Sequence, residues 1–473
     1  MSARATISAP TAPAARPNWR AEIVATTQLA APIVIANLGQ IAINTTDVLL
    51  MGWLGPHALA AGALGTNTLF AIIVGALGII IAVSPLAAHA IGARDTAAAN
   101  RALHAGLWTS VILSVPAGAL VWFSPDALAW LGEPPATVAM TREYLQALVW
   151  SLFPFLAFAA LRAYIAAYQR PTAGTVVMLA GIALNAILAY GLMFGRWGMP
   201  ELGLVGAGIA TSVGNALMGL ALAAFVVVDP QFRARRPFAG LWRFPAMQLR
   251  ELLRVGGPIG GAMTLEVGIF AAAAMMMGLI GMAELAANQI ALQMAAFTFM
   301  IPMGIGQAAT VRVALAAGRG DARAAATAGW VAIALGVGVI AVAALAMWTW
   351  PERLVGLFVD PAHPDTAEVA ALAVSFLVVA AAFQLVDATQ GIAGGALRGL
   401  KDTRVPMAVA VFGYWIVGAP LGLVLAFPAG LRGIGIWIGL AVGLAVVSVL
   451  LLWRWQILSS RAIAATTSDS AAA

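Results

Sequence analysis

Long apolar runs recur along the whole chain, and no other feature constrains the fold as strongly. Each run holds roughly 20 residues, enough for a helix to cross about 30 Å of hydrocarbon. The runs lack the alternating polar and apolar residues of membrane β-strands. We therefore predict an all-α integral membrane protein. Its twelve transmembrane helices are expected at 23–51, 59–87, 103–123, 141–166, 172–195, 202–228, 250–281, 285–315, 326–348, 367–396, 404–427 and 431–457.

The few charged residues indicate how the chain lies in the membrane. They make up 9% of the residues, whereas about 25% is usual in soluble proteins. Of the 25 basic residues, 21 are assigned to the termini or the even-numbered loops, and the other four are Arg142, Arg196, Arg353 and Arg432. The positive-inside rule then places both termini and the loop 229–249 in the cytoplasm. The net charge of +6 thus reflects membrane topology, and we expect no nucleic-acid partner.

A constant offset in residue number relates the two halves of the chain. The matched pairs are Pro32 and Pro258, Met51-Gly52 and Met277-Gly278, Gly78 and Gly304, Gly92 and Gly318, and Asp95 and Asp321, so the offset is 258 − 32 = 226. The shift spans an even number of helices, so the repeats are parallel and related by an axis along the membrane normal. We expect two pseudo-symmetric six-helix lobes.

The lobes and the loop between them divide the chain into five parts. These are a disordered cytosolic tail at 1–22, an N-lobe at 23–228, a cytoplasmic inter-lobe loop at 229–249, a C-lobe at 250–457 and a cytosolic tail at 458–473. Residues 1–20 are rich in Ala, Pro and Ser and do not resemble a cleaved leader. The last residues, from Thr466, are also expected to be disordered.

Three carboxylates lie inside the apolar runs: Asp47, Glu266 and Asp387. A carboxylate at this depth costs roughly 2.5–3.5 kcal/mol on insertion scales, so each is a candidate functional residue. The repeat aligns Glu266 with Gln40 and Asp47 with Ala273, so neither acid has an ionisable counterpart. Packing alone does not need this asymmetry, whereas a site with a different role in each lobe does.

Both C-lobe acids share helix faces with polar or aromatic residues. Asp387 lies on a stripe that we expect to face a cavity, together with Phe383, Gln384, Gln390, Gly391 and Gly394. The alternative is a carboxylate that is hydrogen-bonded within the helix bundle. Glu266 lies about mid-span, on the face of Met263 and Phe270, and the alternative is a glutamate that reaches the membrane interface. On the next helix Gln289 forms a polar face with Asn288 and Gln293, which can instead be interhelical hydrogen bonding.

The N-lobe acid lies nearer a helix end. Asp47 follows Gln40 by two turns, and Asn185, Thr211 and Asn215 are polar residues of later helices in the same lobe. They can complete an oxygen-rich site with Asp47. The alternatives are an acid that faces outward at the surface, and ordinary interhelical hydrogen bonds for the other residues.

Several other motifs predict no chemistry. Gly206-x-Gly208 and Gly433-x-Gly435 lie in apolar helices without a βαβ setting, so we interpret them as small-residue helix packing. The four histidines, His57, His89, His104 and His363, show no catalytic or metal-ligand spacing. The chain has no cysteine, which excludes disulfides and thiolate metal sites. We expect neither an enzyme nor a cofactor.

Longer motifs run through both lobes. In the N-lobe they are Leu29-Ala-Ala-Pro32 with Gln40, Asp47 and Met51-Gly52, and Pro200 to Thr211. In the C-lobe they are Gln289 to Gly306 with Arg312-Val313, and Asp387-Ala388-x-Gln390 with Leu397-Arg398-Gly399-x-Lys401-Asp402. Together they resemble the multidrug and toxic compound extrusion (MATE) family, in particular its NorM-type branch. The resemblance runs from about 23 to 457.

The resemblance implies a twelve-helix exporter whose two lobes form a V-shaped cavity. It implies a C-lobe cation and drug site at Glu266 and Asp387, where Na⁺ can bind, and we add Phe383, Gln390 and Gln289 from the helix faces. It implies an N-lobe proton or sodium site at Asp47 with Asn185 and Thr211, and we add Gln40. The chain departs from the family's frequent residues at three positions, where Phe383 replaces tyrosine, Asn288 replaces histidine and Ala189 replaces a second asparagine. The first and third departures leave the coupling ion open.

The residues and the resemblance together predict a cation-coupled antiporter. It would use Na⁺ or H⁺ to export cationic amphipathic drugs across a bacterial inner membrane by alternating access. We expect a monomer in the lipid bilayer, with no cofactor besides the coupling ion. The main alternative is a lipid-linked oligosaccharide flippase of the same superfamily, which would need Arg or Lys inside the cavity, whereas the basic residues here are assigned to the membrane edges. An intramembrane enzyme and a non-transporting scaffold are the remaining alternatives.

Overall fold

The computed structural model describes residues 18–359 and 366–472, with side chains up to Ala465. Every regular element in these residues is a helix, and twelve spans are long and apolar enough to cross a membrane. The prediction of an all-α protein with twelve membrane-spanning helices is therefore confirmed. Many of the observed helices extend beyond the apolar runs, as does α4 (Thr96–Trp130), which was expected at 103–123. The Asp95 side chain caps this helix by accepting a hydrogen bond from the Ala98 N–H at 2.8 Å.

The elements follow one another in two groups. The first group is α1 (Trp19–Leu54), α2 (Pro56–Ile81), α3 (Val83–Gly92), α4, α5 (Pro135–Leu148), η1 (Val149–Ser151), α6 (Leu152–Ala167), α7 (Thr172–Phe194) and α8 (Gly203–Val228). The short α9 (Pro230–Arg233) lies in the linker. The second group is α10 (Ala246–Ile280), α11 (Met282–Gly318), α12 (Ala322–Thr349), α13 (Pro351–Val355), α14 (Ala367–Gly399), α15 (Arg404–Ala410), the π-helical η2 (Val411–Gly418), α16 (Ala419–Ala426) and α17 (Arg432–Ala472).

Three of the predicted spans are interrupted. The second breaks at Ala82 between α2 and α3, and the fourth contains the 3₁₀ turn η1 between α5 and α6. Pro85 and Pro154 lie just after these breaks and have no N–H to donate back to the preceding turn. The eleventh span widens into the π-helix η2.

The ends of the helical region also differ from the prediction. The helix α1 begins at Trp19, inside the predicted tail, because the Asn18 side chain accepts a hydrogen bond from the Ala21 N–H at 3.1 Å. The rest of that tail, 1–17, lies outside the described residues. Disorder from Thr466 is wrong, since α17 continues to Ala472. Its last turns are rich in alanine and contain neither glycine nor proline, so nothing in the sequence stops the helix.

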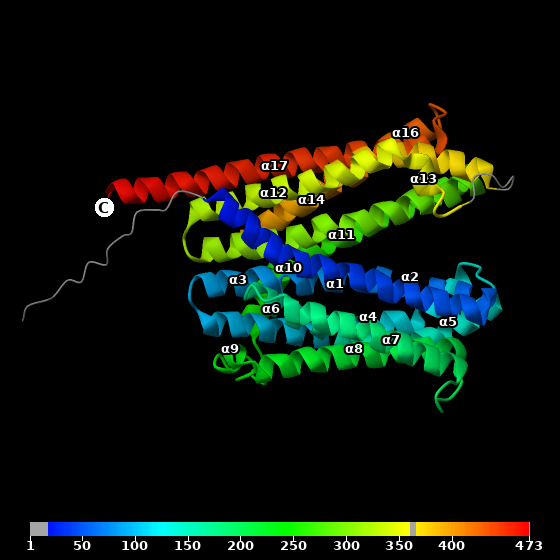
Figure 1. Cartoon of the computed structure of the whole chain (residues 1–473), viewed down its shortest axis with the longest axis horizontal. Coiled ribbons are helices and arrows are strands. Elements are labelled where there is room, and N and C mark those ends of the chain that lie inside the picture. Colours follow the sequence, from blue (N-terminus) through cyan, green and yellow to red (C-terminus); the bar gives the residue numbers. More distant parts are fainter. Residues whose placement is uncertain (1–17, 360–365, 473) are drawn as a thin grey trace, which may run out of the picture.

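The two lobes meet along the helices α1, α2, α3, α10 and α11 (Figure 1). A Cβ on Gly78 would lie 2.5 Å from the Gly260 Cα, and one on Gly304 would lie 3.1 Å from the Val34 N. Val34 and Gly260 are themselves related by the repeat offset, as are Gly78 and Gly304. The glycines that reveal the sequence repeat are therefore points where the lobes touch, and the pseudo-symmetry relates the two contacts.

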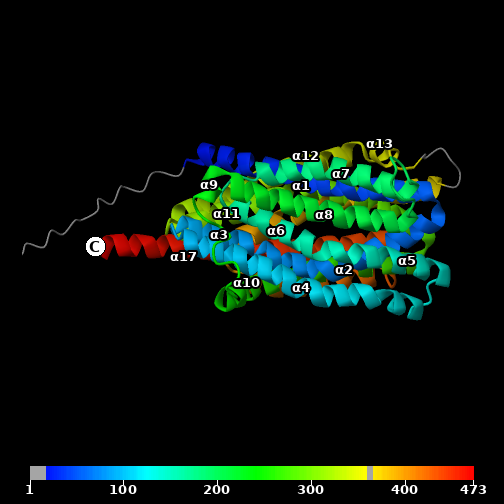
Figure 2. The ribbon, with the colours of Figure 1, turned by 90° about the horizontal axis from the view of Figure 1, so that it is seen from below.

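All these contacts lie toward one end of the bundle. We call it the basic end, since it holds Arg94, Arg170, Arg235, Arg319 and Arg454. Asn67 and Gln293 lie about three turns before Gly78 and Gly304 on the same helix faces, and both are exposed. Polar side chains avoid lipid, so we infer that these faces line a cleft between the lobes toward the opposite end. The ribbons of α2 and α11 diverge in that direction (Figure 1), and the helices run along the long axis of the molecule (Figure 2).

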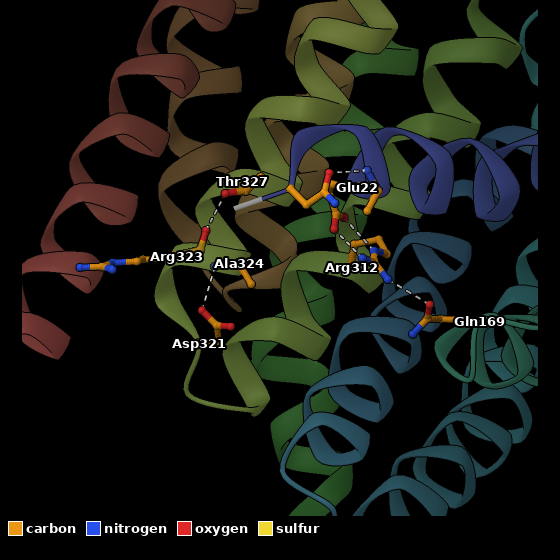
Figure 3. A network of polar contacts seen from close by, with 9 residues as sticks. Glu22, Gln169, Arg312, Asp321, Arg323, Ala324 and Thr327 are labelled. Atoms are coloured by element: carbon orange, nitrogen blue, oxygen red, sulfur yellow. Dashed lines mark hydrogen bonds and ion pairs between the residues drawn. The ribbon is translucent and has the colours of Figure 1, made fainter. Parts of the chain in front are cut away.

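An ion pair also bridges the lobes at the basic end (Figure 3). Arg312 on α11 donates from Nε to Glu22 Oε1 at 2.8 Å and from Nη2 to Glu22 Oε2 at 2.5 Å. Its Nη1 donates to Gln169 Oε1, in the turn after α6, at 3.1 Å. The repeat offset relates Glu22 to Gln248 and Arg312 to Leu86. Neither counterpart is charged, so the pseudo-symmetry does not duplicate this ion pair.

The linker between the lobes is held against α4. Three α4 side chains lie on one helix face and bond linker carbonyl oxygens at 2.7–2.9 Å: Asn100 with Arg235, His104 with Pro237, and Trp108 with Leu241. The Gly-x-Gly motifs also act in packing, as predicted. A Cβ on Gly206 or Gly435 would lie 2.6 Å from the backbone of a neighbouring helix.

Candidate functional site

The N-lobe acid is held by two neutral side chains. Asn185 on α7 donates from Nδ2 to Asp47 Oδ1 at 2.8 Å, and Thr211 on α8 donates from Oγ1 to Asp47 Oδ2 at 3.4 Å. Asp47 thus faces into the lobe and is not the outward-facing acid considered as an alternative. Gln40 does not join this group, because its Nε2 lies 3.5 Å from Asn44 Oδ1 on the same helix.

The environment of Asn185 explains why only one amide reaches this acid. Ala189, one turn later on α7, is fully buried in an apolar cluster with Leu50 and Met193. The polar residue Asn215 makes no hydrogen bond to Asp47 among the residues that the structure describes.

The two C-lobe acids lie at one depth. Lys401 Nζ lies 2.9 Å from Glu251 Oε1, which fixes the end of α14 beside the start of α10. Measured from this pair, Glu266 lies about four turns along α10, and Asp387 lies about four turns back along α14. Four turns of α-helix rise roughly 22 Å, so the two acids are level with each other. The two carboxyl groups also lie near enough for their charges to interact, so we treat them as one candidate site.

Asp387 is an unpartnered acid. It is 7% exposed, and it makes neither a hydrogen bond nor an ion pair within the described part of the chain. The bundle-internal hydrogen bond considered as an alternative is therefore not found. Glu284, another buried acid, forms an ion pair with Arg432. The buried Glu284 thus has a charged partner, whereas Asp387 has none among the described residues.

The stripe around Asp387 does not face a cavity along its whole length, so that expectation is wrong in part. Gln384 is fully buried and donates from Nε2 to the Ala295 carbonyl oxygen of α11 at 3.0 Å. Phe383 is also buried, and its ring stands edge-on to Trp437 and Phe270 at 5.7 and 6.1 Å. Helical period identifies one face of a helix, but a neighbouring helix covers this part of it.

The remaining predicted C-lobe residues differ in exposure. Gln390 is half-buried one turn from Asp387, and Gln289 is exposed on α11. Asn288 is buried, and neither atom of its amide has a hydrogen bond in the described residues. Gln289 and Asn288 therefore do not share one polar face.

Tyr414 is a site residue that the sequence analysis missed. It lies in the π-helix η2, is 5% exposed, and its hydroxyl has no hydrogen-bonding partner among the described residues. Both Glu266 and Asp387 act on it electrostatically. A buried tyrosine hydroxyl thus lies near the two acids, on a helix other than that of Phe383. Single π-helical turns are frequent at functional sites, but no sequence pattern marks this one.

Arg398 is the second missed residue, and it corrects the assignment of all basic residues to the membrane edges. The helix α14 extends to Gly399, and Arg398 donates from Nε to the Gly394 carbonyl oxygen at 3.1 Å and from Nη2 to the Gly391 carbonyl oxygen at 3.3 Å. The side chain therefore turns back into the bundle, where it interacts electrostatically with Glu266. Arg162 also lies within a helical span, on α6.

No ready-made metal centre occurs in the described residues. No three side chains among their His, Asp and Glu residues come close enough together to hold a metal ion. The two acids Glu266 and Asp387 would need other oxygen ligands to hold Na⁺. His363 lies outside the described residues.

Comparison with known proteins identifies the family. A family model described as MatE matches residues 32–191 and 258–424, and the starting positions of the two matches differ by the repeat offset, 258 − 32 = 226. The chain belongs to the MatE family. The model therefore matches once in each lobe, and the resemblance inferred from the motifs is confirmed.

Relatives of this MatE chain share most of its length. Proteins named "Probable multidrug resistance protein NorM" are 45% identical in Mesorhizobium japonicum, covering 92% of this chain and 94% of the relative, and 44% identical in Rhodopseudomonas palustris, covering 96% of each. A solved structure described as an outward-facing conformation of a multidrug resistance MATE family transporter has a TM-score of 0.84 at 20% identity, covering 93% of this chain and 96% of that one. A eukaryotic MATE transporter has a TM-score of 0.82 at 21% identity, covering 94% and 98%. At such identities the structures show the fold alone.

Proposed function

We propose that this MatE-family protein exports cationic amphipathic drugs in exchange for Na⁺ or H⁺. The observation that carries the proposal is Asp387, a buried acid without a partner in the described residues, at the depth of Glu266. A buried charge is stable only when paired, so the site needs a cation from outside the protein. The relatives named as multidrug resistance proteins support a drug as the source of that cation.

The C-lobe site binds the drug in this proposal. Glu266 and Asp387 supply the negative charge, and the Tyr414 hydroxyl supplies a hydrogen bond. The half-buried ring of Phe270, one turn after Glu266 and edge-on to the buried Phe383, offers aromatic surface near the acids, which favours a ring-bearing or quaternary cation. Gln390 and Gln289 give polar contacts toward the cleft.

The N-lobe site binds the coupling ion. Asp47 already has an amide and a hydroxyl at its oxygens, so it can take up a proton or Na⁺ without a large ligand. Protonation would remove an acceptor for Asn185 and change the contact between α1 and α7. Such a local change can favour one arrangement of the lobes over the other.

Alternating access then follows from the two-lobe arrangement. The lobes touch at the basic end and part at the other, so one rocking motion can close the cleft and open the basic end. We place the basic end and both termini in the cytoplasm of a bacterial inner membrane, by the positive-inside rule. In this state the cleft faces outward. The protein is proposed to act as a monomer.

Transport into vesicles tests the proposal. Purified protein is reconstituted, and a Na⁺ gradient or a pH gradient is imposed separately while uptake of a cationic dye is followed. We expect one gradient to drive uptake and Asp387→Asn to abolish it. Uptake that neither gradient changes would overturn the coupling, and equal uptake by Asp387→Asn would overturn the site.

Orientation is tested separately in the chain's natural cysteine-free background. Gly240 lies in the linker at the basic end. A cysteine introduced by Gly240→Cys should resist an impermeant thiol reagent added to intact cells and react once the cells are opened. Ready labelling of intact cells would reverse the proposed topology.

A further inference from the structure

We propose that Arg398 gives the C-lobe site an anion-binding pole, so that the site takes zwitterionic amphipaths whose two charges are separated by about one to two turns of helix. This inference rests on the proposed function. In it, the ammonium group of the ligand meets Glu266 and Asp387, and its carboxylate meets Arg398. The separation is the rise of the four to seven residues from Asp387 to Gly391 and Gly394, about 6 to about 10 Å at about 1.5 Å for each residue.

The first argument is the position of Arg398 on α14. It follows Asp387 by about three turns, so both lie on one face of the helix. The guanidinium reaches back toward Asp387, because it donates to the carbonyl oxygens of Gly394 and Gly391 at 3.1 and 3.3 Å. A negative and a positive pole therefore lie along one stripe.

The second argument is that no carboxylate forms a direct ion pair with Arg398 among the described residues. No carboxylate lies within 4 Å of its guanidinium in the parts of the chain that the structure covers, whereas Arg312 and Arg454 each hold one at 2.5–2.8 Å. Arginine has five N–H donors, of which two are used here. The remaining donors can form the two parallel hydrogen bonds of a guanidinium–carboxylate pair. A ligand carboxylate would provide what the protein does not.

The third argument is the space between the poles. Gly394 is buried, yet a Cβ there would meet only Arg398 Nη2 within 4 Å, at 3.8 Å. A Cβ on Gly391 would meet only the Phe299 ring, at 3.4 Å. At the tight glycine contacts between the lobes such a Cβ would meet backbone atoms at 2.5–3.1 Å, so there is more room beside Gly391 and Gly394 in the directions of their missing side chains. An aromatic ring beside an uncrowded face suits the apolar body of an amphipath.

A competing role for Arg398 is that of a resident counter-ion to Glu266. In that case its removal would strengthen the binding of every cation, whether or not the ligand carries a carboxylate. The ligand-binding role instead predicts that only ligands with a carboxylate lose affinity. Two forms of one dye separate the two roles.

The experiment uses a rhodamine dye as its free acid, a zwitterion, and as its methyl ester, a cation. Binding to purified full-length protein is measured by fluorescence polarisation for the wild type, Arg398→Gln and Arg398→Lys. We expect the wild type to bind both forms. Arg398→Gln should weaken acid binding at least 10-fold and change ester binding by less than about 3-fold, since a charge-assisted hydrogen bond contributes about 1.5–3 kcal/mol. The affinity of Arg398→Lys for the acid should lie between those of the wild type and Arg398→Gln, because lysine keeps the charge but lacks the planar guanidinium group.

Binding of the ester shows that each variant is folded. The ratio of acid affinity to ester affinity in the wild type tests the inference without any variant. A wild type that binds the ester and rejects the acid would overturn the inference and leave the proposed function in place. Equal changes for acid and ester in Arg398→Gln would also overturn it. If the wild type bound neither form, the proposed function itself would fail.

Discussion

Asp47 in the N-lobe accepts hydrogen bonds from Asn185 and Thr211, whereas Asp387 in the C-lobe has no partner in the described residues. Neutral donors satisfy Asp47 before any ligand arrives, which suits a small ion that comes and goes. Asp387 stays unsatisfied until a cation binds, which suits a drug that must be held. One duplicated scaffold thus carries two acids in different chemical settings.

The two sites also lie at different depths. The repeat aligns Glu266 with Gln40, and Asp47 follows Gln40 by seven residues. Seven residues of helix rise about 10 Å, so Asp47 lies that much nearer the wide end of the cleft. We therefore expect the N-lobe and C-lobe acids to contact different ligands, and coupling between them to pass through the arrangement of the lobes.

The largest expected effect is that of Asp387→Asn. The amide keeps the shape of the side chain and removes a charge that has no ion-pair partner among the described residues. We expect binding of a cationic dye to weaken by more than 10-fold and cellular dye efflux to fall to the background. Equilibrium binding to purified protein and efflux from cells are the measurements.

Asp321→Asn is the matched control for this variant. Asp321 caps α12 by accepting a hydrogen bond from the Ala324 N–H at 2.9 Å, and asparagine caps a helix equally well. The control should bind and export dye like the wild type. Dye efflux that survives in Asp387→Asn would show that the unpartnered acid is not the drug site.

The second prediction concerns Glu266 and Asp387 as a unit. If both acids hold one cation, Glu266→Gln should weaken dye binding. The double variant that also carries Asp387→Asn should bind the dye less than about 3-fold more weakly than the weaker-binding single variant. A double-mutant cycle on dye affinity measures this coupling. If the fold-losses of dye affinity in the two single variants multiplied in the double variant, the two carboxyl groups would act on different ligands despite their common depth.

Much of the fold and part of each site could be predicted because the causes are local in sequence. Run length gives the twelve spans, and a constant offset gives the two lobes. Asp47 and Asp387 are recognisable because a charge inside an apolar run is costly wherever the neighbouring helices lie. The glycines Gly78 and Gly304 also mark real lobe contacts.

The remaining site residues depend on side-chain direction and helix register, which no local pattern gives. Helical period places Gln384 on the stripe of Asp387, but only the packing of α11 shows that it faces a neighbour. Tyr414 reaches the acids from within a π-helix, where the ordinary α-helical period no longer applies. Arg398 looks like an edge residue until its guanidinium is seen turned back over Gly394.

The third prediction separates the N-lobe site from drug binding. Asp47→Asn should change dye affinity by less than about 2-fold, because Asp47 lies about 10 Å from the depth of the C-lobe acids. It should nevertheless fail to release dye when Na⁺ or acid is added, since the ion has lost its charged ligand. Dye release from purified protein after an ion jump is the measurement. A large loss of affinity in Asp47→Asn alone would place this acid in the drug site.

The last prediction concerns the ion pair that joins the lobes without touching either site. Glu22 and Arg312 are 14% and 18% exposed at the side chain, and the basic end cannot open while their two hydrogen bonds persist. A cysteine introduced by Leu86→Cys reports opening by its reaction with a thiol reagent. Glu22→Gln should raise the rate of this labelling several-fold. Leu86 is 7% exposed at the basic end and is the repeat counterpart of Arg312.

Glu251→Gln is the matched control for the inter-lobe pair, since Glu251 pairs with Lys401 at 2.9 Å within the C-lobe alone. It removes an ion pair at the same end but should leave the labelling rate unchanged. Exchanging the charges, Glu22→Arg with Arg312→Glu, should return labelling toward the wild-type rate, because the attraction between the lobes is restored. Dye affinity should stay within about 2-fold in all these variants, since neither site loses a contact. If Glu22→Gln and Glu251→Gln labelled alike, the lobes would be held closed by the glycine contacts, and the two sites would communicate without this ion pair.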